Sequence, residues 1–208
     1  PWRPRRKAPC KGRIVRLGWL TDIHLNFLDE PQLENFLRTL SETEVDAWLI
    51  GGDIAEGPTV TVQLVEIADR VPVPIYFILG NHDFYYSSLA AVANRVHARL
   101  SAHPRLVWLT ESEPLLLSET VALVGDDSWA DARLGDPAGT KIEVNDFYRI
   151  KELKGLGHAE RLRALNQIGD AAATRLKPKL ESASRARSQI VVLTHVPPFA
   201  EAASHEGR

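Results

Sequence analysis

Residues 74–88 read PIYFILGNHDFYYSS, and this stretch decides the fold. An apolar run over 75–79 ends at a glycine and is followed at once by Asn81, His82 and Asp83. Short uninterrupted apolar runs are typical of strands that are buried on both faces of a parallel sheet. The stretch therefore predicts a buried strand that carries an amide, an imidazole and a carboxylate at its carboxyl end.

Similar short apolar runs recur along the chain, and helical patterns lie between the early ones. The helical patterns have apolar residues at i, i+3, i+4 and i+7, and they follow Pro31, Pro58 and the pair Ser87 and Ser88. Such alternation predicts parallel strands joined by right-handed crossovers, with helices covering the sheet. The predicted strands are residues 14–20, 45–50, 73–79, 106–109, 121–124 and 190–193, and the predicted helices are residues 33–40, 60–68 and 89–100.

The pattern changes in the second half of the chain. Between 106 and 124 the strands follow one another without a helix, which predicts a hairpin-like or mixed sheet. Residues 125–158 show no sustained period, and we interpret them as the rim of a functional site, because long loops inside a domain are usually functional or disordered. The candidate rim residues, which are equally well explained as solvated turn residues, are Asp126, Asp127, Trp129 and residues 145–148. A last helix is predicted over about 159–177, with Pro178 kinking or restarting it before the final strand.

Composition limits the class of protein. A chain of 208 residues with 44% apolar content and a formal net charge of −2 predicts one soluble globular domain. No apolar run approaches the roughly 20 residues of a membrane span, so neither a span nor a signal peptide is expected. The single cysteine, Cys10, excludes an internal disulfide framework and a cysteine-rich metal site, and it fits a reducing compartment. These features predict a cytoplasmic protein with no membrane partner.

The amino-terminal segment differs in charge from the rest. Residues 1–13 contain six Lys or Arg and no acidic residue. We interpret them as a flexible solvated segment preceding a domain of residues 14–208, rather than as a nucleic-acid surface, because the remainder is mildly acidic. Nucleic acid is therefore not expected as a partner.

Three further apolar runs also end in side chains that bind metal ions. Asp22 and His24 follow the first run, Asp53 follows the second, and His195 follows the last. In open α/β sheets, ligands bind beyond the carboxyl ends of the strands. These side chains are therefore expected to meet the block of residues 81–83 in one crevice.

The spacing of these residues suits a metal centre. Asp22 and His24 are two residues apart and would point the same way in an extended segment, so both can hold one ion. Asp53 follows two glycines, which permit a sharp turn and leave its carboxylate free to bridge two cations about 3.5–4 Å apart, as in two-metal hydrolytic sites. Asn81 would add a neutral oxygen ligand.

Two residues of the block suggest roles other than metal binding. His82 would face a substrate, while Asp83 fixes its tautomer or raises its basicity through a hydrogen bond. Each fragment alone has a simpler explanation: a turn with a capping Asp, a glycine turn, a helix-entry turn, or a histidine at the end of a buried strand. Their joint occurrence after four apolar runs favours a dinuclear metal site.

From residue 14 onward the chain resembles the calcineurin-like metallophosphoesterases. The family's blocks Asp-x-His, Gly-Asp, Gly-Asn-His-Asp and a later His stand here at residues 22–24, 52–53, 80–83 and His195. The resemblance implies an α/β fold, a four-layer αββα sandwich of two mixed β-sheets flanked by helices. It also implies hydrolysis of a phosphomonoester or phosphodiester by a metal-bridging hydroxide, with a small phosphate ester as the substrate.

The resemblance also implies a ligand set. Asp22, His24 and Asp53 would hold one metal ion, and Asp53, Asn81 and His195 would hold the other. The implied cofactors are two divalent transition-metal ions. Mixed Asp, Asn and His donors suit Mn, Fe, Zn or Co better than Ca, and Mn is the first expectation.

The resemblance assigns the chemistry to the remaining block residues. His82 would contact the phosphate or protonate the leaving oxygen, with Asp83 behind it. Phe84, Tyr85 and Tyr86 follow directly, and we interpret them as packing of the helix entry, with stacking on a base or a lipid head group as the alternative.

One departure from the family concerns the end of the site. The family normally supplies a Gly-His-x-His block after the residue matched by His195, and only His205 follows here. We expect this block and the closing strands beyond Arg208, because a missing final strand would expose a sheet edge. The alternatives are an inactive metal-binding scaffold with the same fold and a nuclease-type phosphodiesterase that uses residues 1–13.

Overall fold

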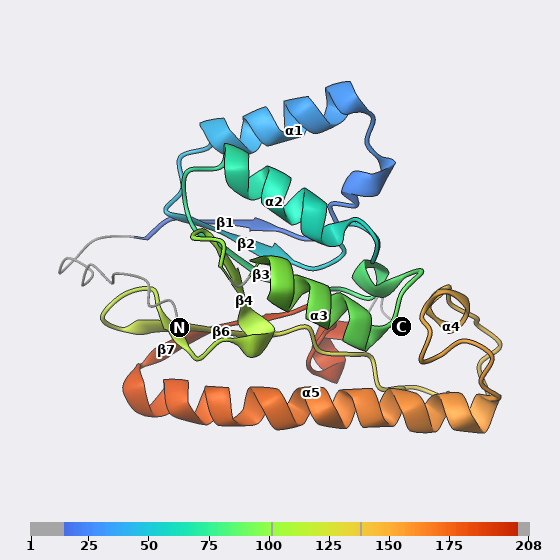
Figure 1. Cartoon of the computed structure of the whole chain (residues 1–208). Coiled ribbons are helices and arrows are strands. Elements are labelled where there is room, and N and C mark those ends of the chain that lie inside the picture. Colours follow the sequence, from blue (N-terminus) through green and yellow to red (C-terminus); the bar gives the residue numbers. More distant parts are fainter. Residues whose placement is uncertain (1–14, 101, 138, 204–208) are drawn as a thin grey trace.

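Two β-sheets lie face to face in the computed structural model, which describes residues 15–100, 102–137 and 139–203 (Figure 1). The first sheet is parallel throughout and has the order β1 (Leu17–Leu20), β2 (Ala47–Gly51), β3 (Ile75–Ile78) and β4 (Leu106–Trp108). The second sheet is mixed, with β6 antiparallel to one neighbour and parallel to the other; its strands are β5 (Leu115–Leu116), β6 (Val121–Asp126) and β7 (Gln189–Thr194).

Helices cover the outer face of each sheet (Figure 1). The helices over the first sheet are α1 (Glu30–Glu42), α2 (Val60–Arg70) and α3 (Leu89–Leu100). The second sheet is covered by α5 (His158–Ala186), and the short α4 (Asp146–Arg149) lies in the connection before it. Short 3₁₀ helices are η1 (Leu25–Phe27), η2 (His82–Phe84), η3 (Leu109–Glu111) and η4 (Ala200–Ala203). This arrangement confirms the predicted four-layer αββα sandwich, except that the first sheet is parallel rather than mixed.

Alternation along the central strands explains why the sheets stack. In β3, Phe77 packs toward α1 to α3, whereas Ile78 packs toward the second sheet. In β6, Leu123 packs between the sheets, whereas Val124 packs toward α5. Since successive side chains point to opposite faces and both faces are covered, these strands appear in the sequence as continuous apolar runs.

Most predicted elements coincide with the observed ones to within a few residues, but the last helix runs to Ala186 instead of ending at about residue 177. The hairpin predicted before residue 124 is formed by β5 and β6. The first of the predicted strands begins outside the described residues, and so does the basic segment of residues 1–13. The helix α1 begins at a capping box, in which the Asp29 side chain accepts the N–H of Gln32 at 2.8 Å and the Gln32 side chain accepts the N–H of Asp29 at 3.0 Å.

The prediction that the helix could restart at Pro178 was wrong, because α5 continues through this residue without a break. Pro178 faces solvent, so water can hydrate the carbonyl of Thr174, which loses its N–H partner. Leu176 and Ala183 meanwhile pack on the second sheet and hold the helix in place. Long as α5 is, no helix among the described residues has both the length and the apolar character needed to cross a membrane.

Candidate metal centre

The predicted metal-binding residues follow strands whose carboxyl ends meet at one edge of the sandwich. Asp22 and His24 follow β1, and Asp53 follows β2. The N–H of Asp22 donates to the carbonyl of Gly52 at 3.1 Å, and the N–H of His24 donates to the carbonyl of Asp53 at 3.0 Å. These bonds keep the two turns side by side beyond the ends of their strands.

The turns are strained in a way that the sequence did not reveal. Asp22, His24 and Asp53 have φ values of 53°, 42° and 52°, in the left-handed region. The extended geometry predicted for residues 22–24 is therefore wrong. Non-glycine residues in this region cost about 1–3 kcal/mol each and persist where the surrounding structure enforces them, which is common at functional sites.

Glycines allow these turns to approach the turn after β3. A Cβ atom added to Gly80 would lie 2.2 Å from Oδ1 of Asp53, and one added to Gly52 would lie 2.5 Å from the nitrogen of Gly80. Gly52 also has a φ of 94°, which side chains rarely tolerate. The close approach predicted for the glycines before Asp53 is thus present.

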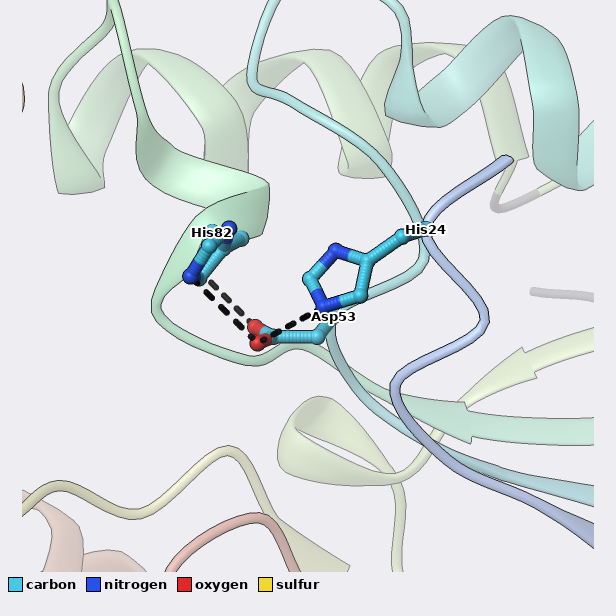
Figure 2. A group of neighbouring side chains, drawn as sticks. All are labelled: His24, Asp53 and His82. Carbon is cyan, nitrogen blue, oxygen red and sulfur yellow. Dashed lines mark hydrogen bonds and ion pairs between the residues drawn. The ribbon is translucent and has the colours of Figure 1, made fainter. Parts of the chain in front are cut away.

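Three imidazole rings converge on the Asp53 carboxylate, which is only 4% exposed. Nε2 of His24 and Nε2 of His82 lie 3.8 Å and 3.9 Å from Oδ2, and Nε2 of His195 lies 3.4 Å from Oδ1. Figure 2 shows His24 and His82 directed toward this carboxylate from two sides. The backbone N–H of His82 also donates to Oδ1 of Asp53 at 2.9 Å, which fixes the carboxylate between the rings.

Two groups of donors could each hold one ion, and within each group the donor atoms lie within 4.8 Å of one another. The groups are His24, Asp53 and His82, and Asp22, Asp53 and His195. Asp53 belongs to both groups, as expected of a bridging ligand. The grouping otherwise differs from the prediction, since Asp22 is placed with His195, and His82 stands among the donors.

The residues present fit divalent metal ions. The Nε2 atoms of three histidines surround the carboxylate oxygens of Asp53, so nitrogen and oxygen donors stand together at one point. Imidazole and carboxylate donors together suit Mn, Fe, Zn and Co. The chemistry of the donor set therefore agrees with a transition-metal centre.

A hydrogen-bond network orients the amide of Asn81. Its Nδ2 donates to Oδ1 of Asp146 at 2.8 Å, and the Tyr85 hydroxyl donates to the same oxygen at 2.6 Å. Oδ1 of Asn81 consequently faces Nε2 of His195 at 3.1 Å, toward the centre. Burial, reinforced by the hydrogen bond to Asp146, raises the pKa of Tyr85, so this hydroxyl stays a donor.

The sequence revealed this network only in part. Asp146 belongs to the predicted rim, whereas the sequence alone favours helix-entry packing for Tyr85. Its position four residues after Asn81 was the available signal, because residues at that spacing meet on one turn.

Asp83 is bonded to the backbone rather than to His82. Its Oδ1 accepts the N–H groups of Ile54 and Ala55 at 2.9 Å and 2.8 Å, and its Oδ2 accepts the N–H of Gly80 at 2.8 Å. The predicted bond to His82 is replaced because these donors occupy both oxygens. Burial raises the pKa of the Asp83 carboxyl to about 8, against the opposing effect of the N–H groups. Asp83 therefore ties the turn after β2 to the turn after β3.

Two other rim candidates support the fold. Asp126 is buried and pairs with Arg175 at 2.8 Å. Oδ1 of Asp127 accepts bonds from the Trp108 indole at 2.9 Å and the Thr110 hydroxyl at 2.7 Å. Neither residue is part of the donor groups around Asp53.

Comparison with known proteins identifies relatives of this chain. The sequence model of the calcineurin-like phosphoesterases matches residues 15–208. A Bos taurus protein named "Transmembrane protein with metallophosphoesterase domain" is 26% identical over 132 residues, which make up 61% of this chain and only 28% of that protein.

Two solved structures share the fold at low identity. The phosphopantetheinyl hydrolase of Mycobacterium tuberculosis has a TM-score of 0.63 and 12% identity, covering 88% of this chain and 68% of its own. A dimetal phosphatase of Danio rerio has a TM-score of 0.52 and 12% identity, covering 89% of this chain and 70% of its own. At such identity the likeness concerns the fold alone.

Proposed function

Because the chain belongs to the calcineurin-like phosphoesterase family, we propose that it hydrolyses a phosphomonoester or phosphodiester at a dinuclear metal site. The observation that carries the proposal is the convergence on Asp53. The buried carboxylate of Asp53 lies within 3.4–3.9 Å of three imidazole nitrogens. It is therefore placed where one ligand could be shared by two metal ions. Family membership supports metal-dependent phosphoester hydrolysis in general.

Five residues are the proposed metal ligands, and Asp53 would be shared by both ions. They are Asp22, His24, Asp53, Asn81 and His195. Two bound divalent ions, with Mn as the first candidate, would lower the pKa of water and neutralise charge on the phosphate. Asp146 would keep the oxygen of Asn81 directed toward the centre through its bond to the amide nitrogen.

His82 is the proposed catalytic residue. Its ring stacks on Tyr85 at a centroid distance of 4.2 Å and is partly exposed, so a proton can pass between the ring and a leaving oxygen. Asp83 acts as a positioning residue, because it holds Gly80 and with it the turn that carries His82. His82 also stands among the donors around Asp53, so metal content and turnover must be measured separately.

The proposed substrate is a small phosphate ester and the proposed location is the cytoplasm. A formal net charge of −2 does not favour nucleic acid, and the single cysteine fits a reducing compartment. Binding of single-stranded nucleic acid with a steep salt dependence would instead support a nuclease.

Metal analysis combined with hydrolysis assays tests the proposal. We expect the purified protein to bind two metal ions per chain, to hydrolyse an aryl phosphate monoester or diester with Mn(II), and to lose this activity on chelation. Two bound metals without turnover of either ester class would favour the inactive scaffold. Activity undiminished after exhaustive metal removal would rule out the dinuclear mechanism.

A further inference from the structure

A cavity of about 330 Å³ opens beside the candidate metal centre. Asn81 and His195 belong both to its wall and to the centre, so the two spaces are continuous. The rest of the wall is largely apolar and is formed by Trp129, Ala132, Val144, Phe147, Leu165 and Val196.

The aromatic side chains of this wall are held in place by neighbours outside the cavity. The guanidinium of Arg161 lies 4.1 Å from the centroid of the Phe147 ring and is itself paired with Glu143 at 3.0 Å. Trp129 packs on Phe84 with ring centroids 5.8 Å apart. The cavity is therefore preformed, as ligand sites usually are.

Several polar atoms of the wall are already engaged in hydrogen bonds within the protein. The Asn81 amide donates to Asp146, and the Ser128 hydroxyl donates to the carbonyl of Asp127 at 2.6 Å. A base or a sugar placed here would leave several of its donors and acceptors without partners, which costs free energy. The Asp146 carboxylate would also oppose a second anionic group.

The size of the cavity limits what can enter it. A cavity of roughly 150 Å³ lined by aliphatic and aromatic side chains holds benzene, so this one has room for a substituted ring or a short branched chain. We propose that the cavity binds the apolar alcohol part of a phosphate ester, an uncharged aryl or alkyl group, while the phosphate lies at the metal centre. This inference rests on the proposed function, since it assigns a substrate class to the same site.

Binding of two phosphonates to the Mn(II)-loaded protein tests the inference without turnover. Phenylphosphonate should bind at least about tenfold more tightly than methylphosphonate, because an apolar pocket discriminates by such factors even for one methylene. Val144→Ser should reduce this preference several-fold. Ile142→Ser is the matched control, since Ile142 is 74% exposed, lies two residues away and is not part of the cavity wall, and it should keep the preference.

Calorimetry of the two phosphonates is paired with hydrolysis of phenyl phosphate and glycerol phosphate. Equal affinity for both phosphonates, binding of neither, or the same loss in both variants would overturn the inference. Hydrolysis of both esters without a phosphonate preference would overturn the inference and leave the proposed function intact. A phosphonate preference without hydrolysis of any ester would support the apolar cavity and contradict the proposed function.

Discussion

The turns after β2 and β3 and the connection of residues 127–157 both border the candidate site, but they are held differently. In the turns, a fully buried Asp83 accepts three backbone N–H groups, which leaves the backbone little freedom. In the connection, Val144 is 42% exposed and Phe147 is held mainly by side chains such as Arg161.

The difference separates two tasks. Donor groups must keep a fixed geometry, which rigid elements supply better than loops. A wall that selects the alcohol part of a substrate can lie on exposed chain, which tolerates substitution without loss of the fold. We therefore expect substitutions in the turns to abolish metal binding or catalysis. Substitutions in the connection should only change the metal affinity or the rate of turnover.

The largest effect is expected for Asp53→Asn. Asparagine keeps an oxygen for the N–H of His82 but removes the charge common to both donor groups. Affinity for both metal ions should fall by more than about 100-fold, because even residues that only support metal ligands contribute 10–100-fold. Metal analysis after dialysis measures this, and Asp22→Asn, which alters one group, should lose less. Two metals per chain at undiminished affinity would show that Asp53 is not shared.

His82→Ala separates catalysis from metal binding within the turns. If His82 transfers a proton, kcat should fall by about 10²–10⁴, with metal content nearly unchanged. His97→Ala, at an exposed histidine of α3, is the control and should leave kcat as it is. An equal loss of metal and activity in His82→Ala would make this residue a ligand instead.

The Asp146→Ala variant changes a residue of the connection that contacts a proposed metal ligand. Without this carboxylate the Asn81 amide loses the acceptor that orients it, so metal affinity should fall by about 10-fold, as for other residues that hold a ligand in place. Tyr148→Phe, in the same short helix α4, removes only a bond to Glu143 and should have little effect. A loss as large as that of Asp53→Asn would break the distinction between the two regions.

The smallest effect is expected for Asp127→Asn, and it concerns stability. Burial raises the pKa of Asp127 to about 6, so the folded protein holds a proton that the unfolded chain releases near pH 4. The stability contributed by this proton is complete below about pH 4 and is lost as the pH rises to about 6. Asparagine does not titrate, so the variant's free energy of unfolding does not fall in this way. In urea unfolding, the free energy of unfolding of the variant relative to wild type should rise by about 1–3 kcal/mol between pH 4 and 7. A difference independent of pH would contradict the raised pKa.

The sequence was sufficient for most strands and helices and for the side chains that follow the strands, whereas the four layers were expected from the family resemblance. Strands such as β3 are buried on both faces, so their apolar runs stand out, and the polar residues after them appear at fixed places. The meeting of Asp53 with His24, His82 and His195 follows from the rule that ligands bind at the carboxyl ends of strands.

The rest depends on contacts between segments far apart in the chain. The bonds of Asp83 to Ile54 and of Asn81 to Asp146 join residues that no local pattern connects. The left-handed backbone of Asp22 and the passage of α5 through Pro178 likewise arise from tertiary packing that overrides local preference.

The unbroken course of α5 adds a second link between regions that the packing of the two sheets already joins. At about 1.5 Å per residue, a helix of 29 residues spans about 43 Å. Leu165, near its start, packs into the core beside the first sheet and forms part of the cavity wall, whereas Ala183, near its end, packs under the second sheet. One rigid rod thus belongs to both cores, so the two halves are expected to unfold as a single cooperative unit. The strand that presents His195 and the wall that would receive a substrate are consequently expected to unfold together.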